Sequence, residues 1–408
     1  MRKWRQFGVA LLLGGVLLGG SQALAGGKIA IDETKWISVG AGLKTSFAAR
    51  EDGAPNGSNW STNFKVDNVR LYFNGQIHKY IKLEVNTECV FCGNSSLERF
   101  ALLDAIAKIE INQYFNIWAG RLLVPAERRE MNGPFYSSTF DPYKTPFYSA
   151  DFSTKFGAGG AGVYERSQGV NVWGAAGPDG AFQYVVGVFD GLQSSKGSGP
   201  NQGDHPMVAG RIAYNFLNVE KNPGYYTSGT YYGGAGDVLT IAAALQYQQD
   251  GSGSFEHPGN FLGFSTDLLF EKPISDRGVL TLNGEYKHFD ADYSSLAFAK
   301  KPDGTDIDHG NFGMFDGDSF SILALYLLPQ TVGIGQFQPY ARYTGVYPNK
   351  SSDRDEVEAG LNYIIDGHNA RVSLFYQYGD IATKGLNYAP NAHGKNVNAV
   401  KLAIQLQI

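Results

Sequence analysis

The chain lacks the features that mark several large protein classes. Only two of its 408 residues are cysteine and four are methionine, and its seven histidines are scattered without metal-ligand spacing. After the first 25 residues, no apolar run approaches the roughly 20 residues that a membrane-spanning helix needs. No Gly-x-Ser-x-Gly motif is present, so we expect no esterase or protease site of that type. A helical membrane protein is therefore excluded, and we assign no catalytic residue, metal site or cofactor.

Residues 1–25 are predicted to form a signal peptide. Arg2, Lys3 and Arg5 provide its basic start, and Ala23 and Ala25 form a small-x-small cleavage site after the apolar run. Removal of this segment leaves 31 of the 34 Lys and Arg residues against 39 Asp and Glu, a net charge of about −8. We therefore expect an exported protein with no nucleic-acid partner.

The two cysteines, Cys89 and Cys92, lie in a single Cys-Val-Phe-Cys sequence. No histidine follows Cys92, which excludes the Cys-x-x-Cys-His signature of c-type haem attachment. Two thiolates supply only half of a tetrahedral zinc site. The expected role is a local disulfide in a loop, with a redox or metal role as the alternative.

Tyrosine, phenylalanine and glycine are abundant (24, 26 and 52 residues), which favours strands and tight turns. At the C-terminus, Val400, Leu402 and Ile404 alternate with Lys401 and Ala403, as in a strand with one apolar and one polar face. We count about sixteen such alternating segments. They are residues 36–50, 65–77, 80–87, 100–111, 116–125, 166–176, 181–190, 207–217, 238–250, 261–271, 279–289, 319–328, 337–347, 356–365, 370–380 and 397–408.

The links between these segments alternate in length. Long links rich in turn-forming residues follow the odd-numbered segments, and most links after even-numbered segments are tight, as at residues 177–180 and 367–369. Long external loops and short periplasmic turns are typical of outer-membrane barrels. The pattern predicts an all-β protein: a transmembrane antiparallel β-barrel of about 16 strands over residues 26–408. Residues 218–237 form a long link where a tight turn is expected. They either contain a small extra hairpin or indicate that one pair of strands is miscounted. On composition alone, an array of secreted β-sandwiches is the rival fold.

The polar face of the predicted strands is charged. Nine basic residues and seven acidic residues are expected to face inward, a near-balance that does not itself set an ion preference. For each of them, a solvated or ion-paired wall position is the alternative to a role in selectivity. The candidate pore-lining or selectivity residues, including three from the longest link, are Arg70, Lys82, Lys108, Arg121, Arg128, Arg129, Lys144, Arg211 and Arg342.

The longest link, residues 126–165, follows the fifth segment. A link of this length without its own secondary structure is usually functional or disordered. Its prolines and aromatic residues favour packing inside the barrel, where it would constrict the pore as the third external loop. The alternative is an external lid over the barrel mouth.

The fourth to sixth segments resemble the phosphate-selective porin O/P family. The resemblance lies in residues 104–110, in residues 117–125 with Gly120 and Pro125 at the strand end, and in residues 165–170. It implies a sixteen-stranded trimeric channel with an inward-folded third loop and a basic path for anions such as phosphate. Two features depart from it, since the chain ends on Ile408 rather than Phe and the inward face lacks a clear excess of Arg and Lys.

From these patterns we expect an outer-membrane porin, with no enzymatic activity, for the passive diffusion of small hydrophilic solutes or anions. Its expected partners are membrane lipids, those solutes and two further copies of the chain. The alternative function is a barrel that sheathes a periplasmic multihaem cytochrome in an electron conduit.

Overall fold

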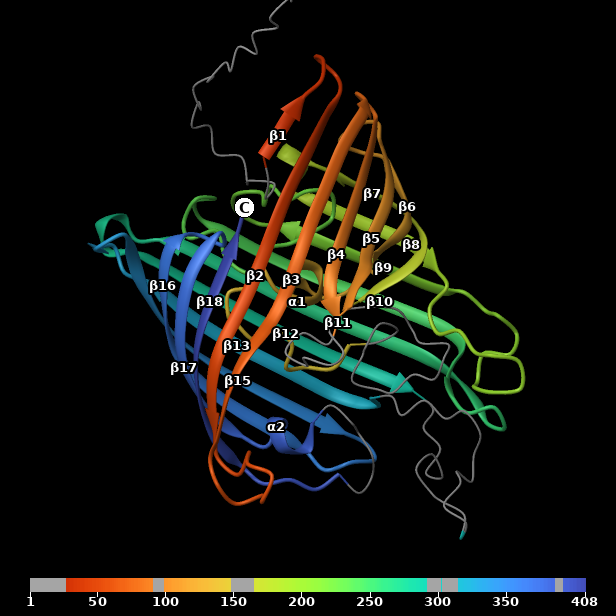
Figure 1. Cartoon of the computed structure of the whole chain (residues 1–408). Helices are drawn as coiled ribbons and strands as arrows, with labels where there is room; N and C mark the ends of the chain where they lie inside the picture. Colours follow the sequence, from red (N-terminus) through yellow and green to blue (C-terminus); the bar gives the residue numbers. More distant parts are fainter. Residues whose placement is uncertain (1–26, 91–98, 148–164, 292–301, 303–314, 386–391) are drawn as a thin grey trace, which may run out of the picture.

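The computed structural model describes residues 27–90, 99–147, 165–291, 302, 315–385 and 392–408. Sixteen long strands form one antiparallel sheet that closes into a barrel where β18 pairs with β2 (Figure 1). The strands are β2 (Trp36–Arg50), β3 (Ser61–His78), β4 (Ile81–Val90), β5 (Arg99–Glu110), β6 (Asn116–Leu123), β7 (Arg166–Ala176), β8 (Phe182–Phe189), β9 (Met207–Asn215), β10 (Val238–Gly253), β11 (Pro258–Pro273), β12 (Val279–Ala291), β13 (Gly317–Leu327), β15 (Gly335–Pro348), β16 (Arg354–Asp366), β17 (Ala370–Gly379) and β18 (Val397–Gln407).

Two short strands and a few helical turns complete the structure. Strand β1 (Gly27–Ala30) pairs with β2, and β14 (Thr331–Val332) forms a small hairpin with β15. The helices are α1 (Arg128–Asn132) and α2 (Ile381–Lys384), and the 3-10 turns are η1 (Pro178–Gly180) and η2 (Ser275–Arg277). Among the described residues, no helix is long and apolar enough to cross a bilayer.

The alternation along each strand determines its two faces. On β18, Leu402 is 47% exposed on the outer surface, whereas Gln405 is fully buried in the interior. Successive strand side chains point to opposite faces, so one residue of register would exchange the two surfaces. The predicted sixteen-stranded barrel, with apolar residues outside and polar residues inside, is therefore confirmed.

The links also follow the predicted alternation. The first described strand, β1, and the end of β18 lie at the barrel end that carries the tight turns, which we call the short-turn end (Figure 1). One of these turns is η1, where Gly177 and Asp179 adopt positive φ angles of 77° and 51°. Glycine adopts such angles without steric cost and Asp tolerates them, which suits the Gly-Pro-Asp-Gly sequence to a tight turn.

Three local expectations need correction or lie outside the described part. Strand β4 continues to Val90, so Cys89 is a buried strand residue opposite Phe100 and not a loop residue. Cys92 lies outside the described residues, as does the predicted signal peptide, and the disulfide stays a prediction. Residues 216–237 add no strand pair, because β9 and β10 are directly paired.

A charged residue on the outer face tests the lipid-facing surface. We expect Leu402→Arg to destabilise the barrel in phospholipid vesicles by about 2–4 kcal/mol, because a cation near the bilayer midplane is poorly solvated. Guanidinium unfolding of the reconstituted protein measures this, with Leu402→Met as the volume-matched control. Equal stability of the two variants would contradict a lipid-facing position for this residue.

Candidate functional site

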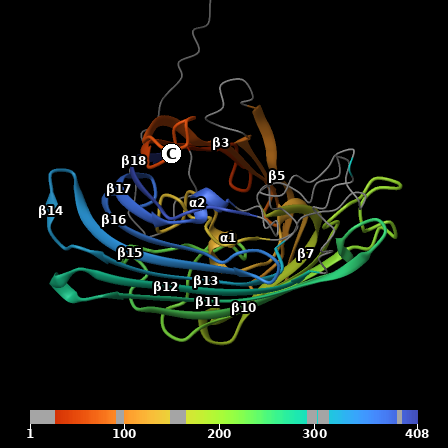
Figure 2. The ribbon, with the colours of Figure 1, turned by 90° about the horizontal axis from the view of Figure 1, so that it is seen from below.

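Residues 124–147, which contain most of the described part of the longest link, lie inside the barrel, and we call them the third loop. In Figure 2, α1 lies within the ring of strands. The Lys44 ammonium on β2 donates hydrogen bonds to the carbonyl oxygens of Pro134 (3.0 Å) and Phe140 (2.6 Å). Arg371 on β17 donates to the carbonyl of Ser137 at 2.8 Å, and to those of Ser138 and Thr139. Two buried cations of the wall therefore hold the loop by its backbone.

Helix α1 begins the inward course of the third loop. The Glu127 carboxylate accepts hydrogen bonds from the backbone N–H groups of Arg129 and Glu130, which caps the helix N-terminus. Gly133 ends the helix with a φ of 62°, a left-handed value that favours glycine. The helix directs Arg128 to Asp267 on β11 and Arg129 to Glu285, the cross-strand neighbour of Asp267 on β12.

Eight of the nine predicted selectivity residues have a carboxylate partner. Arg128 makes a two-pronged pair with Glu220, with both N–O distances at 2.7 Å, and it also contacts Asp267. Such pairs are stronger than single contacts and fix the geometry of the guanidinium group. The remaining pairs are Arg70–Glu88, Lys82–Glu110, Lys108–Glu84, Arg129–Glu285, Lys144–Glu356, Arg211–Asp267 and Arg342–Glu358.

Arg121 is the exception, and its predicted place in the lumen is wrong. It pairs in the sheet with Ala105 and Gln168 and shares their outward face. The next residue, Leu122, is fully buried on the inward face. The residue that precedes Arg121, Gly120, has a φ of 129°. Because glycine has no side chain, it does not show which face of the strand it occupies, and the alternation of apolar and polar residues cannot be followed through this point.

A second segment enters the barrel from the short-turn end. Residues 216–237, here called the inner link, connect β9 to β10 and meet the third loop. The Gly229 N–H donates to the Tyr136 carbonyl at 2.9 Å, and the Ser138 hydroxyl donates to the Gly229 carbonyl at 2.7 Å. The Tyr225 hydroxyl donates to the Leu123 carbonyl at 2.8 Å. The link that broke the predicted pattern of loop lengths is therefore part of the barrel interior.

A single wall carboxylate, Glu271 on β11, holds the inner link. It accepts hydrogen bonds from the Thr230 hydroxyl (2.6 Å) and from the backbone N–H groups of Tyr231 (3.0 Å) and Gly233 (2.8 Å). The His368 ring, in the turn between β16 and β17, donates from Nε2 to the Thr230 carbonyl at 3.0 Å. Burial lowers the pKa of His368 to about 3, and the nearby Arg371 adds to this effect, so the ring is neutral.

Aromatic rings clamp the inner link against the wall. Trp118 on β6 lies against Tyr225 and Tyr226, with ring centroids 5.2 and 5.4 Å away, and it also packs on Trp173. A Cβ atom on Gly224 would come 2.3 Å from the Trp118 ring, and Gly224 has a φ of 59°. Only glycine suits this close approach, so the packing of the inner link on the wall requires a glycine at position 224.

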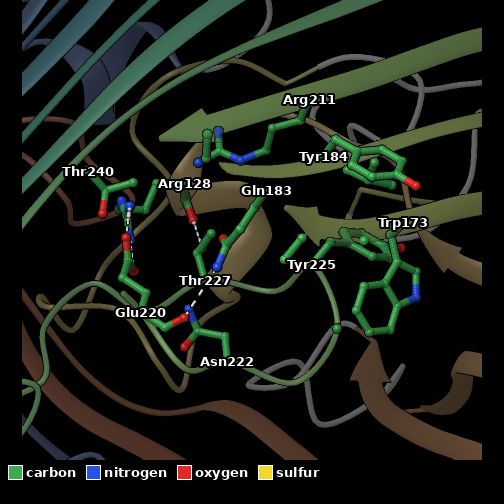
Figure 3. A pocket seen from close by; sticks show the side chains of 15 residues that line it. Arg128, Trp173, Gln183, Tyr184, Arg211, Glu220, Asn222, Tyr225, Thr227 and Thr240 are labelled. Carbon is green, nitrogen blue, oxygen red and sulfur yellow. Dashed lines mark hydrogen bonds and ion pairs between the residues drawn. The ribbon is translucent and has the colours of Figure 1, made fainter. Parts of the chain in front are cut away.

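The inner link borders two cavities that are lined by described residues. The first lies toward β7–β9, and Figure 3 shows Arg128 and Glu220 at one side of it and Trp173 with Tyr184 at the other. The second lies toward β3–β5, and the inner-link residues Asn222 and Thr227 border both cavities. Of the described residues, no group of three or more His, Cys, Asp or Glu could hold a metal ion.

An acidic cluster surrounds the start of α1. Glu127, Glu130 and Glu285 share two cations, Arg129 and Lys287, which leaves one carboxylate uncompensated. Burial raises the pKa of Glu130 to about 8 against the opposing effect of Lys287, and the neighbouring Glu127 and Glu285 add to the increase. Glu130 is therefore largely protonated at neutral pH.

Comparisons with known proteins place the fold but not a family. No family model matches the chain, and no curated protein matches its sequence. Solved structures do match. The anion-selective porin from Comamonas acidovorans aligns with a TM-score of 0.55 at 15% identity, over 92% of this chain and 100% of that one.

Two further structures extend the comparison. The outer membrane channel DcaP of Acinetobacter baumannii aligns with a TM-score of 0.52 at 13% identity, over 94% of this chain and 100% of that one. OmpT, an outer membrane protein of Vibrio cholerae in its trimer form, has a TM-score of 0.50 at 11% identity, over 92% of this chain and 100% of that one. The chain therefore has the fold of outer-membrane porins.

Proposed function

We propose that this chain is an outer-membrane porin for the passive diffusion of small hydrophilic solutes. The observation that carries the proposal is the closed barrel with an apolar outer face and a charged, hydrogen-bonded interior. Such a barrel satisfies its backbone within the membrane and encloses a polar passage. We assign no chemical step to the interior.

The third loop and the inner link together form the proposed constriction. They enter from opposite ends of the barrel and meet through Gly229, Tyr136 and Ser138. A passage bounded by two inserted segments would be narrower than one bounded by a single loop. The same filling argues against the alternative function, because a cytochrome sheathed by the barrel would need the space that the chain's own segments occupy.

The ion preference of the proposed channel is weak in our interpretation. Strong anion selectivity requires basic residues in the passage whose charge no carboxylate neutralises. Eight of the nine candidate selectivity residues are paired with a carboxylate. Arg371 is bound mainly to carbonyl groups instead, and in this proposal it supplies the residual positive potential. The resemblance to phosphate-selective porins and the likeness to an anion-selective porin support a modest preference for anions, including phosphate. Homotrimer formation is proposed on the same grounds and on the trimer form of a similar structure.

Planar-bilayer recording tests the proposal. We expect discrete conductance steps from the purified mature chain, with a reversal potential in a potassium chloride gradient that lies slightly toward anions. Replacement of chloride by phosphate then measures whether phosphate is among the preferred anions. A protein that inserts into the bilayer and conducts no ions would overturn the proposed function.

Removal of the inner link tests the second half of the constriction. We expect replacement of residues 218–236 by a two-residue Asn-Gly turn to raise the single-channel conductance roughly twofold or more, because a segment that fills the passage is lost. The matched control replaces residues 329–334, the exposed turn that contains β14 at the same barrel end. Equal conductance of the two deletion variants would show that the inner link does not restrict ion flow.

The raised pKa of Glu130 predicts a pH-dependent selectivity. As the pH rises through about 8, Glu130 loses its proton and adds a negative charge to the lumen, so cation permeability should increase between pH 7 and pH 9. Glu130→Gln retains the neutral form and should abolish the change. Reversal potentials at both pH values measure it, with the exposed Glu33→Gln as the control. A shift that persists in Glu130→Gln would assign the titration to another group.

A further inference from the structure

The second cavity has a specific polar lining. It lies between the wall strands β3–β5, helix α1 and the inner link, and we call it the inner chamber. Its lining includes Arg70, Asn86 and Asp104 from the wall, Asn132 from α1, and Tyr226 from the inner link. The third loop and the inner link, the two segments of the proposed constriction, thus both contribute residues to the inner chamber.

The charged groups of the inner chamber already have partners of opposite charge. Arg70 is paired with Glu88, and Glu84 is paired with Lys108. Asp104 binds Arg166 at 2.9 Å. These charges cancel within the wall, so a solute in the chamber meets little net charge from them.

Several buried polar atoms at the inner chamber lack a hydrogen-bond partner among the described residues. They are Arg70 Nη2, Asn86 Oδ1, Asn132 Oδ1 and the hydroxyls of Tyr72 and Tyr226. Arg70 and Asn86 are each only 6% exposed. Native proteins seldom bury such atoms unpaired, because each costs desolvation free energy that no contact offsets.

The Asn86 amide orientation is fixed by its neighbours. Its Nδ2 group donates to Glu84 Oε1 at 2.7 Å and to Asp104 Oδ2 at 3.0 Å, and both of these atoms are acceptors. The amide nitrogen must therefore face the carboxylates, which leaves Oδ1 as an acceptor. The chamber consequently combines free acceptors with a free guanidinium donor and phenol groups that can donate or accept.

We infer that the inner chamber is a binding subsite for an uncharged, polyhydroxylated small solute. The inference rests on the proposed channel function and specifies its solute class. A hydroxyl group both donates and accepts, so one polyol can pair with the Asn86 carbonyl, the Arg70 guanidinium and the Tyr226 phenol together. A phosphate ion brings negative charge into a chamber whose charged groups are already paired and whose lining includes Asp104 and Glu84, and an ammonium ion without hydroxyls cannot accept a hydrogen bond from Arg70. Neither satisfies the whole set.

Tryptophan fluorescence provides a test that needs no ion flow. The Trp118 ring lies 5.4 Å from Tyr226, so a solute in the inner chamber should change its emission. The detergent-purified mature chain is titrated with glucose, with inorganic phosphate and with tetramethylammonium. We expect a saturable change with glucose and none with the two ions at equal concentration.

Two variants locate the glucose site. Tyr226→Phe and Tyr72→Phe each remove one hydroxyl that is unpaired among the described residues, and each should weaken glucose binding roughly 2- to 10-fold, the effect of one lost hydrogen bond. Tyr247→Phe on the exposed outer face is the matched control and should bind glucose as the unmodified chain does. Circular dichroism checks that all three variants retain their strand content.

The outcomes separate the inference from the proposed function. Absence of a glucose response, a stronger response to either ion, or equal glucose affinity in the two chamber variants and the control overturns the inner chamber as a polyol subsite. A chain that binds glucose and conducts no ions retains the subsite and loses the channel. A chain that conducts ions without a glucose response retains the channel alone.

Discussion

Closure of the sheet between β18 and β2 is the constraint on which the other features of this protein depend. A strand in hydrocarbon has no water to bond its backbone groups, so every strand must have a neighbour on both sides. Once the barrel closes, each strand has one face toward lipid and one toward an enclosed interior. The alternation along β18, with Leu402 outside and Gln405 inside, is the local expression of that global requirement.

An enclosed interior changes what a charged side chain can do. Arg128 is almost fully buried, and it is stabilised by Glu220 and Asp267 at the same time. Removing one partner from such a set leaves an uncompensated buried charge, which is far more costly than the loss of a surface pair. The number of basic residues on the inward face therefore says little about the potential that a solute meets. The pairing of those residues within the wall decides it.

The two inserted segments are held by complementary chemistry. Wall cations, Lys44 and Arg371, bind the third loop through its carbonyl oxygens. A wall anion, Glu271, binds the inner link through its N–H groups. Irregular backbone carries donors and acceptors that must be paired when it is buried, and oppositely charged wall residues satisfy the two kinds separately. The polar interior thereby allows both segments to lie where an apolar core would exclude them.

The sequence determined the barrel, because alternation with a period of two is a local property that each segment displays by itself. It also determined which end carries the long links, and the aromatic residues and prolines of residues 126–165 favoured an inward third loop. Arg70 and Arg342 were identified as inward residues from their neighbours alone. At Arg121 the same reasoning failed, since the adjacent Gly120 gives no sign of which face it occupies.

Only the tertiary structure decided the rest of the site. Glu220 meets Arg128 across 92 residues, and Arg371 meets the third loop across more than 230, and no local pattern encodes pairings at such separations. The inner link appeared in the sequence as an exception to the rule of loop lengths, without a sign of where it lies. Barrel closure brings these distant residues into one small volume, and the need to pair every buried charge and backbone group there selects their partners.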